Sequence, residues 1–337
     1  MKYVYVLTSS EKDYYYEQFL LSLASMRLYN HDAEVTVLID EKTKQGLTGR
    51  RSGYTQYISE TKVISVPDEY PQKQASRWIK TSINNYVSGD FLFIDCDTII
   101  TGKLAPVFSP EINIGAVLDT HTTLEEHHLR NYFAAEVRKA GFSAPFTKNT
   151  YFNSGIIFYR DNSRSKEFFS QWHKLWMESN KKGVSVDQPS FNQADCDLRN
   201  IITELSGIWN CQISHNGLNF LHNAKIIHYY ATSLLLLASP YKLASSEVLL
   251  SIKETGEISA ETDKLLKQPL AAFDDNTRIV SGKYILDVFD SPMFKLLVWL
   301  RDCHKPMYKL INGILRFFVN ILKKNPGYSK RKLRKNK

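Results

Sequence analysis

The first two thirds of the chain alternate between short apolar runs and longer segments with helical spacing. Short apolar runs bounded by polar loops predict buried strands, and apolar residues repeated every three or four positions predict helices. This alternation is typical of βαβ units and of an α/β fold with a largely parallel sheet. Strands are predicted at Tyr3–Leu7, Val35–Ile39, Lys62–Val66, Phe91–Ile94, Asn113–Leu118, Tyr151–Arg160 and Ala224–Ile227, with helices from about Asp13, over Ala75–Val87, after Arg160 and from Asp187.

Residues 286–337 combine apolar side chains with an excess of basic ones. Lysine and arginine interrupt the apolar runs, which are shorter than the ~20 residues that a membrane-spanning helix needs. Such helices are suited to lie in an anionic membrane surface, and the basic terminus Lys330–Lys337 adds attraction. We expect a membrane-associating tail, the alternative being a core helix with a solvated end. The predicted organisation is an α/β domain over 1–235, a helical extension over 236–285 and this tail over 286–337.

The net charge of +8 is unevenly distributed. Of the 43 Lys and Arg residues, 13 lie in residues 295–337 beside a single acid, Asp302, so the remainder carries 30 basic and 34 acidic side chains. Nucleic-acid-binding proteins usually spread basic residues over the surface that reads the nucleic acid, so this distribution argues against that class. Four scattered cysteines and an N-terminus unlike a signal peptide lead us to expect a cytoplasmic protein, peripheral on the inner face of the membrane.

The strand Phe91–Ile94 ends in Asp95-Cys96-Asp97, the most informative motif of the chain. Open α/β sheets bind ligands at the carboxyl edge of their strands, where this motif delivers two carboxylates. Two carboxylates this close repel each other unless a cation lies between them. Because hard oxygen ligands suit Mg²⁺ or Mn²⁺ carrying a phosphate, the motif predicts a metal-assisted phosphate or nucleotide site. A solvated turn is the simpler alternative.

The same motif loosely fits Asp-x-Asp-x-Thr of phosphatases with an aspartyl nucleophile. Those enzymes normally carry it on their first strand and need a later lysine and a second acidic pair at a strand end. Here at least three predicted strands precede the motif, and Asp274-Asp275 lies in a polar loop with no apolar strand before it. The phosphatase is therefore the weaker interpretation.

Four separated segments, in order and with their strand context, resemble the GT-A fold nucleotide-sugar glycosyltransferases. The closest resemblance is to the retaining family 8 type, which includes glycogenin-like enzymes and bacterial lipopolysaccharide galactosyl- and glucosyltransferases. It covers roughly residues 1–230 and implies a Rossmann-like mixed sheet flanked by helices, plus a C-terminal helical appendage. The segments are Phe91–Thr98, Tyr151–Tyr159, Asp187–Asn192 with Trp209-Asn210, and Ile226–Tyr229.

The resemblance implies a role for each matching residue. Asp95, Asp97 and His228 match the ligands of a Mn²⁺ or Mg²⁺ ion that bridges the donor diphosphate, and Asp95 is also expected to reach the donor ribose. An imidazole with two carboxylates suits Mn²⁺ better than Ca²⁺. Asp187 and Gln188 match the pair that contacts the transferred sugar, which makes them the expected catalytic residues. The expected donor- and substrate-binding residues are Thr8, Ser9, Arg77, Asp95, Asp119 and Asn153.

The sequence departs from the family pattern directly after His228. The family commonly places a glycine and a lysine there, and the lysine grips the donor diphosphate. This chain instead continues Tyr229-Tyr230-Ala231-Thr232-Ser233, with no lysine before Lys242. Another cation that serves the phosphates, a different mode of diphosphate binding, or a weak enzyme would each account for the departure.

The implied function is metal-dependent transfer of a hexose from a nucleotide sugar, with UDP as the expected nucleotide. The expected acceptor is a glycan or glycolipid such as lipopolysaccharide, and the expected outcome is retention of configuration. Two alternatives remain open: an inverting transferase of the same fold, and a catalytically silent, membrane-bound sugar-nucleotide-binding protein. The expected partners are the donor, the acceptor and an anionic membrane surface, without nucleic acid.

Overall fold

The computed structural model describes residues 1–104, 109–127, 129–142, 148–230, 241–275, 277, 287–289 and 291–323. The chain forms two compact units, Met1–Thr277 and Arg278–Lys337. The first contains both sheets and two clusters of buried hydrophobic side chains. The boundaries placed at residues 235 and 285 stay predictions.

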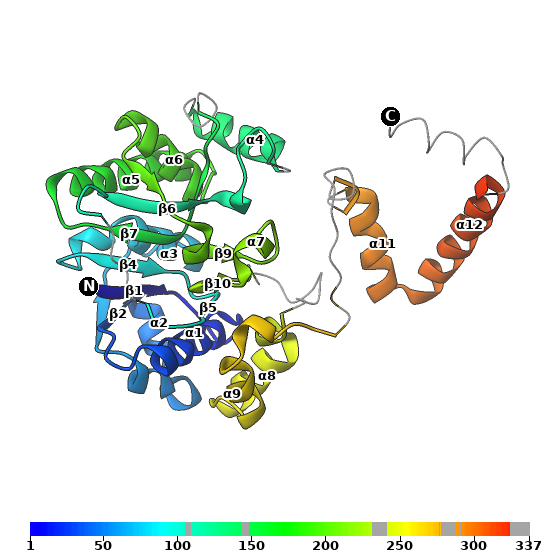
Figure 1. The fold of residues 1–337 in the computed structure, drawn as a ribbon, viewed down its shortest axis with the longest axis horizontal. Coiled ribbons are helices and arrows are strands. Elements are labelled where there is room, and N and C mark those ends of the chain that lie inside the picture. Colours follow the sequence, from blue (N-terminus) through cyan, green and yellow to red (C-terminus); the bar gives the residue numbers. More distant parts are fainter. Residues whose placement is uncertain are drawn as a thin grey trace. The chain divides into compact units, whose positions relative to one another are not determined.

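A seven-stranded mixed sheet forms the centre of the first unit (Figure 1). β1 pairs in parallel with β2 and β4, β2 with β3, and β6 with β8, whereas β7 is antiparallel to β4 and β6. The predicted α/β class with a mixed sheet is confirmed. The spatial order is β3 (Glu60–Ile64), β2 (Val35–Asp40), β1 (Lys2–Leu7), β4 (Phe91–Ile94), β7 (Phe152–Tyr159), β6 (Ile114–Leu118) and β8 (Ile202–Glu204).

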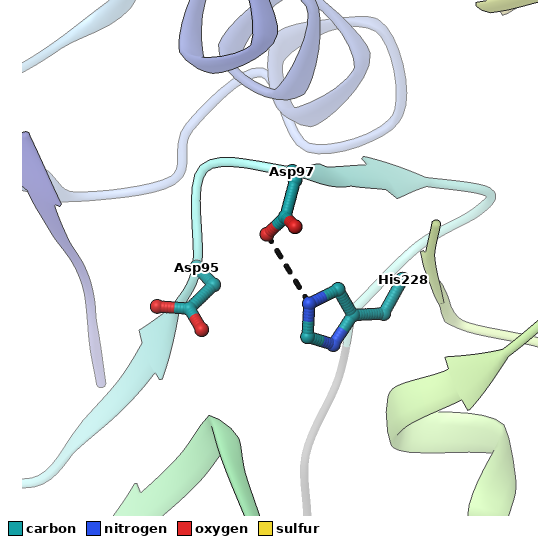
Figure 2. A group of neighbouring side chains, drawn as sticks. All are labelled: Asp95, Asp97 and His228. Atoms are coloured by element: carbon teal, nitrogen blue, oxygen red, sulfur yellow. Dashed lines mark hydrogen bonds and ion pairs between the residues drawn. The ribbon is translucent and has the colours of Figure 1, made fainter. Parts of the chain in front are cut away.

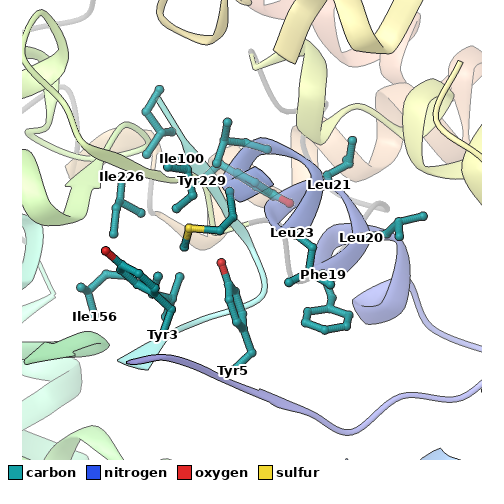
Figure 3. Close-up of a cluster of buried hydrophobic side chains, with 14 of the residues drawn as sticks. Tyr3, Tyr5, Phe19, Leu20, Leu21, Leu23, Ile100, Ile156, Ile226 and Tyr229 are labelled. Carbon is teal, nitrogen blue, oxygen red and sulfur yellow. The ribbon is translucent and has the colours of Figure 1, made fainter. Parts of the chain in front are cut away.

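Helices cover both faces of this sheet, so its central strands are almost wholly buried. Successive residues of β1 alternate between two clusters, as the period of a strand requires. Tyr3 and Tyr5 enter the first hydrophobic cluster, where Figure 3 shows them with side chains of α1. Residues of α8 and α9 belong to the same cluster, and Val4 enters the second, with α3, α5 and α6. The helices of this unit are α1 (Tyr15–Tyr29), α2 (Glu41–Gly46), α3 (Gln72–Thr81), α4 (Arg130–Ala140), α5 (Ser163–Lys181), α6 (Gln188–Asp197), α7 (Leu218–Leu221), α8 (Ser246–Thr255) and α9 (Ala260–Leu266).

A second, three-stranded sheet joins distant parts of the chain. Its order is β5 (Thr98–Ile100), β10 (Ile226–His228) and β9 (Cys211–Gln212). β10 is antiparallel to β5, and the register places His228 opposite Thr98. Because Thr98 directly follows Asp97 in the chain, this pairing carries His228 to the end of β4.

The second unit contains the helices α11 (Pro292–Cys303) and α12 (Lys305–Lys323), so the predicted C-terminal helical appendage is present. Polar residues of α12, such as Lys309, Asn312 and Arg316, share one side of the helix, and apolar residues occupy the rest. Among the described helices, none has the length and apolarity that crossing a membrane requires. The basic segment Lys330–Lys337 lies outside the described residues. The exposed apolar side chains of α12 are Met307, Leu310, Ile314, Leu315, Phe317, Phe318, Val319, Ile321 and Leu322.

Replacement of Trp172 tests the assigned core. Trp172, on α5, is fully buried in the second hydrophobic cluster, and its Nε1–H donates to the Asp187 carbonyl oxygen over 3.1 Å. Trp172→Ala is expected to lower the free energy of unfolding by about 3–5 kcal/mol, because it leaves a cavity. Chemical denaturation measures this loss. The matched control is Trp299→Ala on α11, where the side chain is 43% exposed and the change should stay below about 0.5 kcal/mol. Equal losses would contradict the assignment.

Candidate active site

Asp95, Asp97 and His228 converge beyond the end of β4 (Figure 2). One ligand atom from each lies within 4.8 Å of the others. His228 Nε2 is 3.2 Å from Asp97 Oδ1. The structure therefore brings together the three residues that the sequence singled out as metal ligands.

The orientation of His228 fits a bound cation. Its Nδ1 lies 3.0 Å from Asn210 Oδ1, and because an amide oxygen only accepts, we assign the proton of the neutral ring to Nδ1. The Nε2 lone pair then faces the Asp97 carboxylate, an arrangement that is stable only with a proton or a metal ion between them. Two carboxylates and one imidazole nitrogen form a donor set that suits Mn²⁺ or Mg²⁺.

Close packing fixes the His228 ring. Tyr230 stacks on it, with ring centroids 4.0 Å apart and an angle of 17° between the planes. On the β7 side, a Cβ added to Gly155 would lie 2.4 Å from His228 Cε1. A side chain at position 155 would therefore collide with the imidazole ring, and glycine lets the β7 backbone approach this candidate ligand closely.

The electrostatics of the cluster favour an added positive charge. Burial raises the pKa of Asp95, and Asp97 adds to the rise while Lys80 opposes it. Burial alone would also raise the pKa of Asp97, but His228 lowers it overall through its charge and hydrogen bond. For His228 burial alone would lower the pKa, and Asp97 raises it overall. A divalent cation would replace the proton between His228 Nε2 and Asp97 and would hold the carboxylates of Asp95 and Asp97 ionised.

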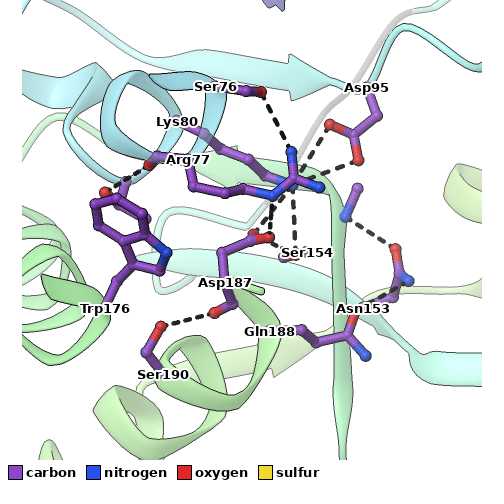
Figure 4. A network of polar contacts seen from close by, with 12 residues as sticks. Ser76, Arg77, Lys80, Asp95, Asn153, Ser154, Trp176, Asp187, Gln188 and Ser190 are labelled. Atoms are coloured by element: carbon purple, nitrogen blue, oxygen red, sulfur yellow. Dashed lines mark hydrogen bonds and ion pairs between the residues drawn. The ribbon is translucent and has the colours of Figure 1, made fainter. Parts of the chain in front are cut away.

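Asp187 forms the second part of the site, between two cations of α3 (Figure 4). Arg77 Nε is 2.7 Å from Asp187 Oδ1, and Lys80 Nζ is 3.2 Å from Asp187 Oδ2. Ser154 Oγ donates to Asp187 Oδ2 over 2.8 Å. Burial alone would raise the pKa of Asp187, but Lys80 and Arg77 outweigh it and hold the pKa well below its usual range. Asp187 is therefore a carboxylate and a weak base.

Asn153 is the centre of a third group of contacts. Its Nδ2 lies 2.8 Å from Asp119 Oδ1, 2.7 Å from the Tyr230 hydroxyl and 3.3 Å from Gln188 Oε1. The other oxygen of Asp119 lies 3.0 Å from His127 Nε2. The amides of Asn153 and Gln188 thus lie beside one another, and the hydrogen bond to Asp119 holds the Asn153 amide in place.

Thr8 and Ser9 follow β1 at the same edge of the sheet. The Thr8 hydroxyl donates to the Gln72 carbonyl oxygen over 3.1 Å, and the Ser9 hydroxyl donates to Asp13 Oδ1 over 2.7 Å. Arg51 also donates to Ser9 Oγ. The Ser9 hydroxyl is therefore already engaged by Asp13 and Arg51.

One open pocket of about 410 Å³ connects these groups. Of the site residues predicted from the sequence, Ser9 and Asp119 are not part of its described lining. The predicted residues that line the pocket are Thr8, Arg77, Asp95, Asp97, Asn153, Asp187, Gln188 and His228.

Three participants were not assigned a role from the sequence. Lys80 bridges Asp95 and Asp187, Tyr230 packs on His228, and Gln212 accepts the Tyr230 hydroxyl hydrogen over 2.9 Å. The position of Lys80, three residues after Arg77 on a predicted helix, is the signal that could have identified it. Of the segment that departs from the family pattern, Tyr229 and Tyr230 are described, whereas residues 231–240 lie outside the described residues.

Comparisons with known proteins identify the family. A profile described as glycosyl transferase family 8 matches residues 13–233. No curated protein matches the chain. Similar solved structures include the galactosyltransferase LgtC with donor and acceptor sugar analogs (13% identity, 78% of this chain and 99% of that chain, TM-score 0.49) and an active-site mutant of LgtC (13%, 77% and 98%, 0.46). Another is the apo form of mouse xyloside xylosyltransferase 1 (13%, 69% and 98%, 0.46). Because the family profile spans well over half of the chain, this protein belongs to glycosyl transferase family 8 and is a glycosyltransferase.

Proposed function

We propose that this glycosyltransferase transfers a hexose from a UDP-linked donor to a glycan or glycolipid such as lipopolysaccharide, with retention of configuration. Asp95, Asp97 and His228 would hold Mn²⁺ or Mg²⁺, and the donor sugar would face Asp187 and Gln188. The observation that carries the proposal is the convergence of the three ligand atoms at a pocket that also presents this Asp-Gln pair.

The reaction exchanges one bond for another at the anomeric carbon. The bond from that carbon to the diphosphate oxygen breaks, and a bond to the acceptor hydroxyl oxygen forms. When bound, the metal ion offsets the charge that develops on the departing diphosphate. The hydroxyl proton passes to the departing diphosphate oxygen, which is available on the same face of the sugar in a retaining transfer.

Asp187 stabilises charge in this scheme and does not abstract a proton. Its carboxylate stays ionised between Arg77 and Lys80 and is therefore a poor base. A fixed negative charge near the sugar stabilises the positive charge that develops there as the bond breaks. The amides of Gln188 and Asn153 lie within 3.3 Å of each other and can orient sugar hydroxyls.

The tail would bring the enzyme to its acceptor. α12 exposes a broad apolar side next to a stripe that includes Lys309 and Arg316, the pattern of helices that lie in an anionic interface. We place the enzyme at the cytoplasmic face of the membrane, where anionic lipids attract basic segments.

Asp97→Asn tests the enzyme directly. The change keeps the size of the side chain and removes one ligand charge, so nucleotide release from a panel of UDP-sugars with Mn²⁺ should fall by at least about 100-fold. Asp263→Asn, on the surface of α9, is the matched control and should keep wild-type turnover. Tight binding of Mn²⁺ and UDP without turnover in the wild type would instead favour the silent binding protein. An inverted anomer in the product would favour the inverting alternative.

Mn²⁺ binding is expected to tighten as pH rises. The pKa of His228 lies above its ordinary 6.5, and below that raised pKa Nε2 carries a proton that the ion must displace. Affinity should fall about tenfold for each pH unit below the raised pKa and level off above it. Titration of the apoprotein with Mn²⁺ over a pH series measures this, and His228→Asn should remove the dependence. Affinity that does not change between about pH 5 and 8 would exclude the imidazole as a ligand.

Paired substitutions on α12 test the membrane tail. Ile314→Asp with Phe318→Asp places two charges on the apolar side and should abolish sedimentation with anionic vesicles. Asn312→Asp with Asn320→Asp adds the same charge to the polar side, so it should weaken sedimentation only moderately. Equal losses would mean that attraction is electrostatic alone, and unchanged sedimentation in both variants would remove the tail hypothesis.

A further inference from the structure

Lys80 is a buried cation in the centre of the site. Its side chain is only 2% exposed, yet it lies on the same helix face as the partly exposed Arg77. Its Nζ is 3.4 Å from both oxygens of Asp95, 3.2 Å from Asp187 Oδ2 and 3.4 Å from Ser154 Oγ. One ammonium thus joins Asp95, a candidate metal ligand, to Asp187, the carboxylate that the proposed function assigns to the sugar.

The contacts of Lys80 use all of its hydrogen-bonding capacity. An ammonium has three N–H donors, and Asp95, Asp187 and Ser154 are three acceptors for them. The Phe93 ring, 5.0 Å away, covers another side of the cation. Lys80 therefore acts on a ligand through its charge and through the carboxylates that it holds.

A count of charges shows what Lys80 changes. Three carboxylates around Lys80 and the candidate ligands, Asp95, Asp97 and Asp187, are opposed by Arg77 and Lys80, which leaves one net negative charge when His228 is neutral. The pocket lining also includes Lys73 and Glu136, whose charges cancel. A divalent ion would make this set positive by one charge. Without Lys80, the same ion would only neutralise it. The positive state is the one that attracts a dianionic diphosphate.

We propose that Lys80 sets the charge of the site so that a divalent ion is held weakly until a nucleoside diphosphate joins it. By pairing with Asp95, Lys80 weakens the binding of the ion. Its charge then strengthens the binding of the diphosphate that joins the ion. It is a positioning residue, and it supplies the charge, though not the contact, of the lysine absent after His228. The inference rests on the proposed metal and donor site.

The two effects of removing Lys80 have opposite signs, and this makes the proposal testable. In Lys80→Met, the apoprotein should bind Mn²⁺ about tenfold more tightly, because a unit charge a few ångströms from the ligands no longer repels the ion. At saturating Mn²⁺, UDP should bind about tenfold more weakly for the same reason. Electron paramagnetic resonance of free Mn²⁺ measures the first affinity, and calorimetry with UDP measures the second.

Three further variants separate charge from structure. Lys80→Arg keeps the charge and should stay within about threefold of wild type for both ligands. Lys80→Gln removes the charge, keeps a donor for the carboxylates and should shift both affinities as the methionine variant does, which covers a failure of that variant to fold. Lys62→Met, on edge strand β3, removes a charge away from the pocket lining and should change neither affinity.

The outcomes distinguish this inference from the proposed function. Neutral variants that weaken both ligands, or change neither, would overturn the role of Lys80 while a wild type that binds Mn²⁺ and UDP keeps the proposed site. A wild type that binds neither ligand would overturn both.

Discussion

The antiparallel pairing of β10 with β5 is the constraint on which the site depends. Successive side chains of a strand point to opposite faces, so a slip of one residue would turn His228 away from Asp97. The register is held by burial of the apolar pairs Ile226–Ile100 and Ile227–Ile99 within the first hydrophobic cluster. The same register therefore satisfies core packing and ligand geometry. Gly155 meets a second requirement, because the absence of a side chain leaves space for the imidazole ring.

Charge compensation is the second organising feature. Buried carboxylates are costly unless cations or hydrogen bonds satisfy them. At Asp187 the protein provides the compensation itself, through Arg77, Lys80 and Ser154. At Asp95 and Asp97 it is incomplete, because Lys80 reaches only Asp95 and Asp97 relies on protonated His228. The excess of negative charge falls where the ligand atoms converge, which is the physical reason to expect a cation there.

The sequence predicted those parts of the molecule that local patterns determine. The strand before Asp95, the turn that delivers Asp97 and the helix that begins at Gln188 are all present, as is the class of the sheet. α3 ends at Thr81, before the predicted end at Val87, since the Ser82 hydroxyl donates to the Trp78 carbonyl oxygen and a 3₁₀ turn follows.

A site residue could be predicted from the sequence only where it belongs to a recognisable local motif. Lys80 resembles a surface lysine on a polar helix, and its burial depends on Asp187, which lies far along the chain. The hydrogen bonds of Gln212 to Tyr230 and of Asn210 to His228 likewise arise from the small second sheet and the turn before it. No local periodicity signals such contacts, because they form only when distant strands pair.

Anomalous scattering from manganese, in crystals of the full chain grown with Mn²⁺ and UDP, is the most direct measurement of the central claim. The account predicts one strong peak coordinated by Asp95, Asp97 and His228 Nε2 at about 2.0–2.3 Å, with diphosphate oxygens on its open side. A peak elsewhere, or UDP bound in the pocket while these three side chains coordinate nothing, would contradict it.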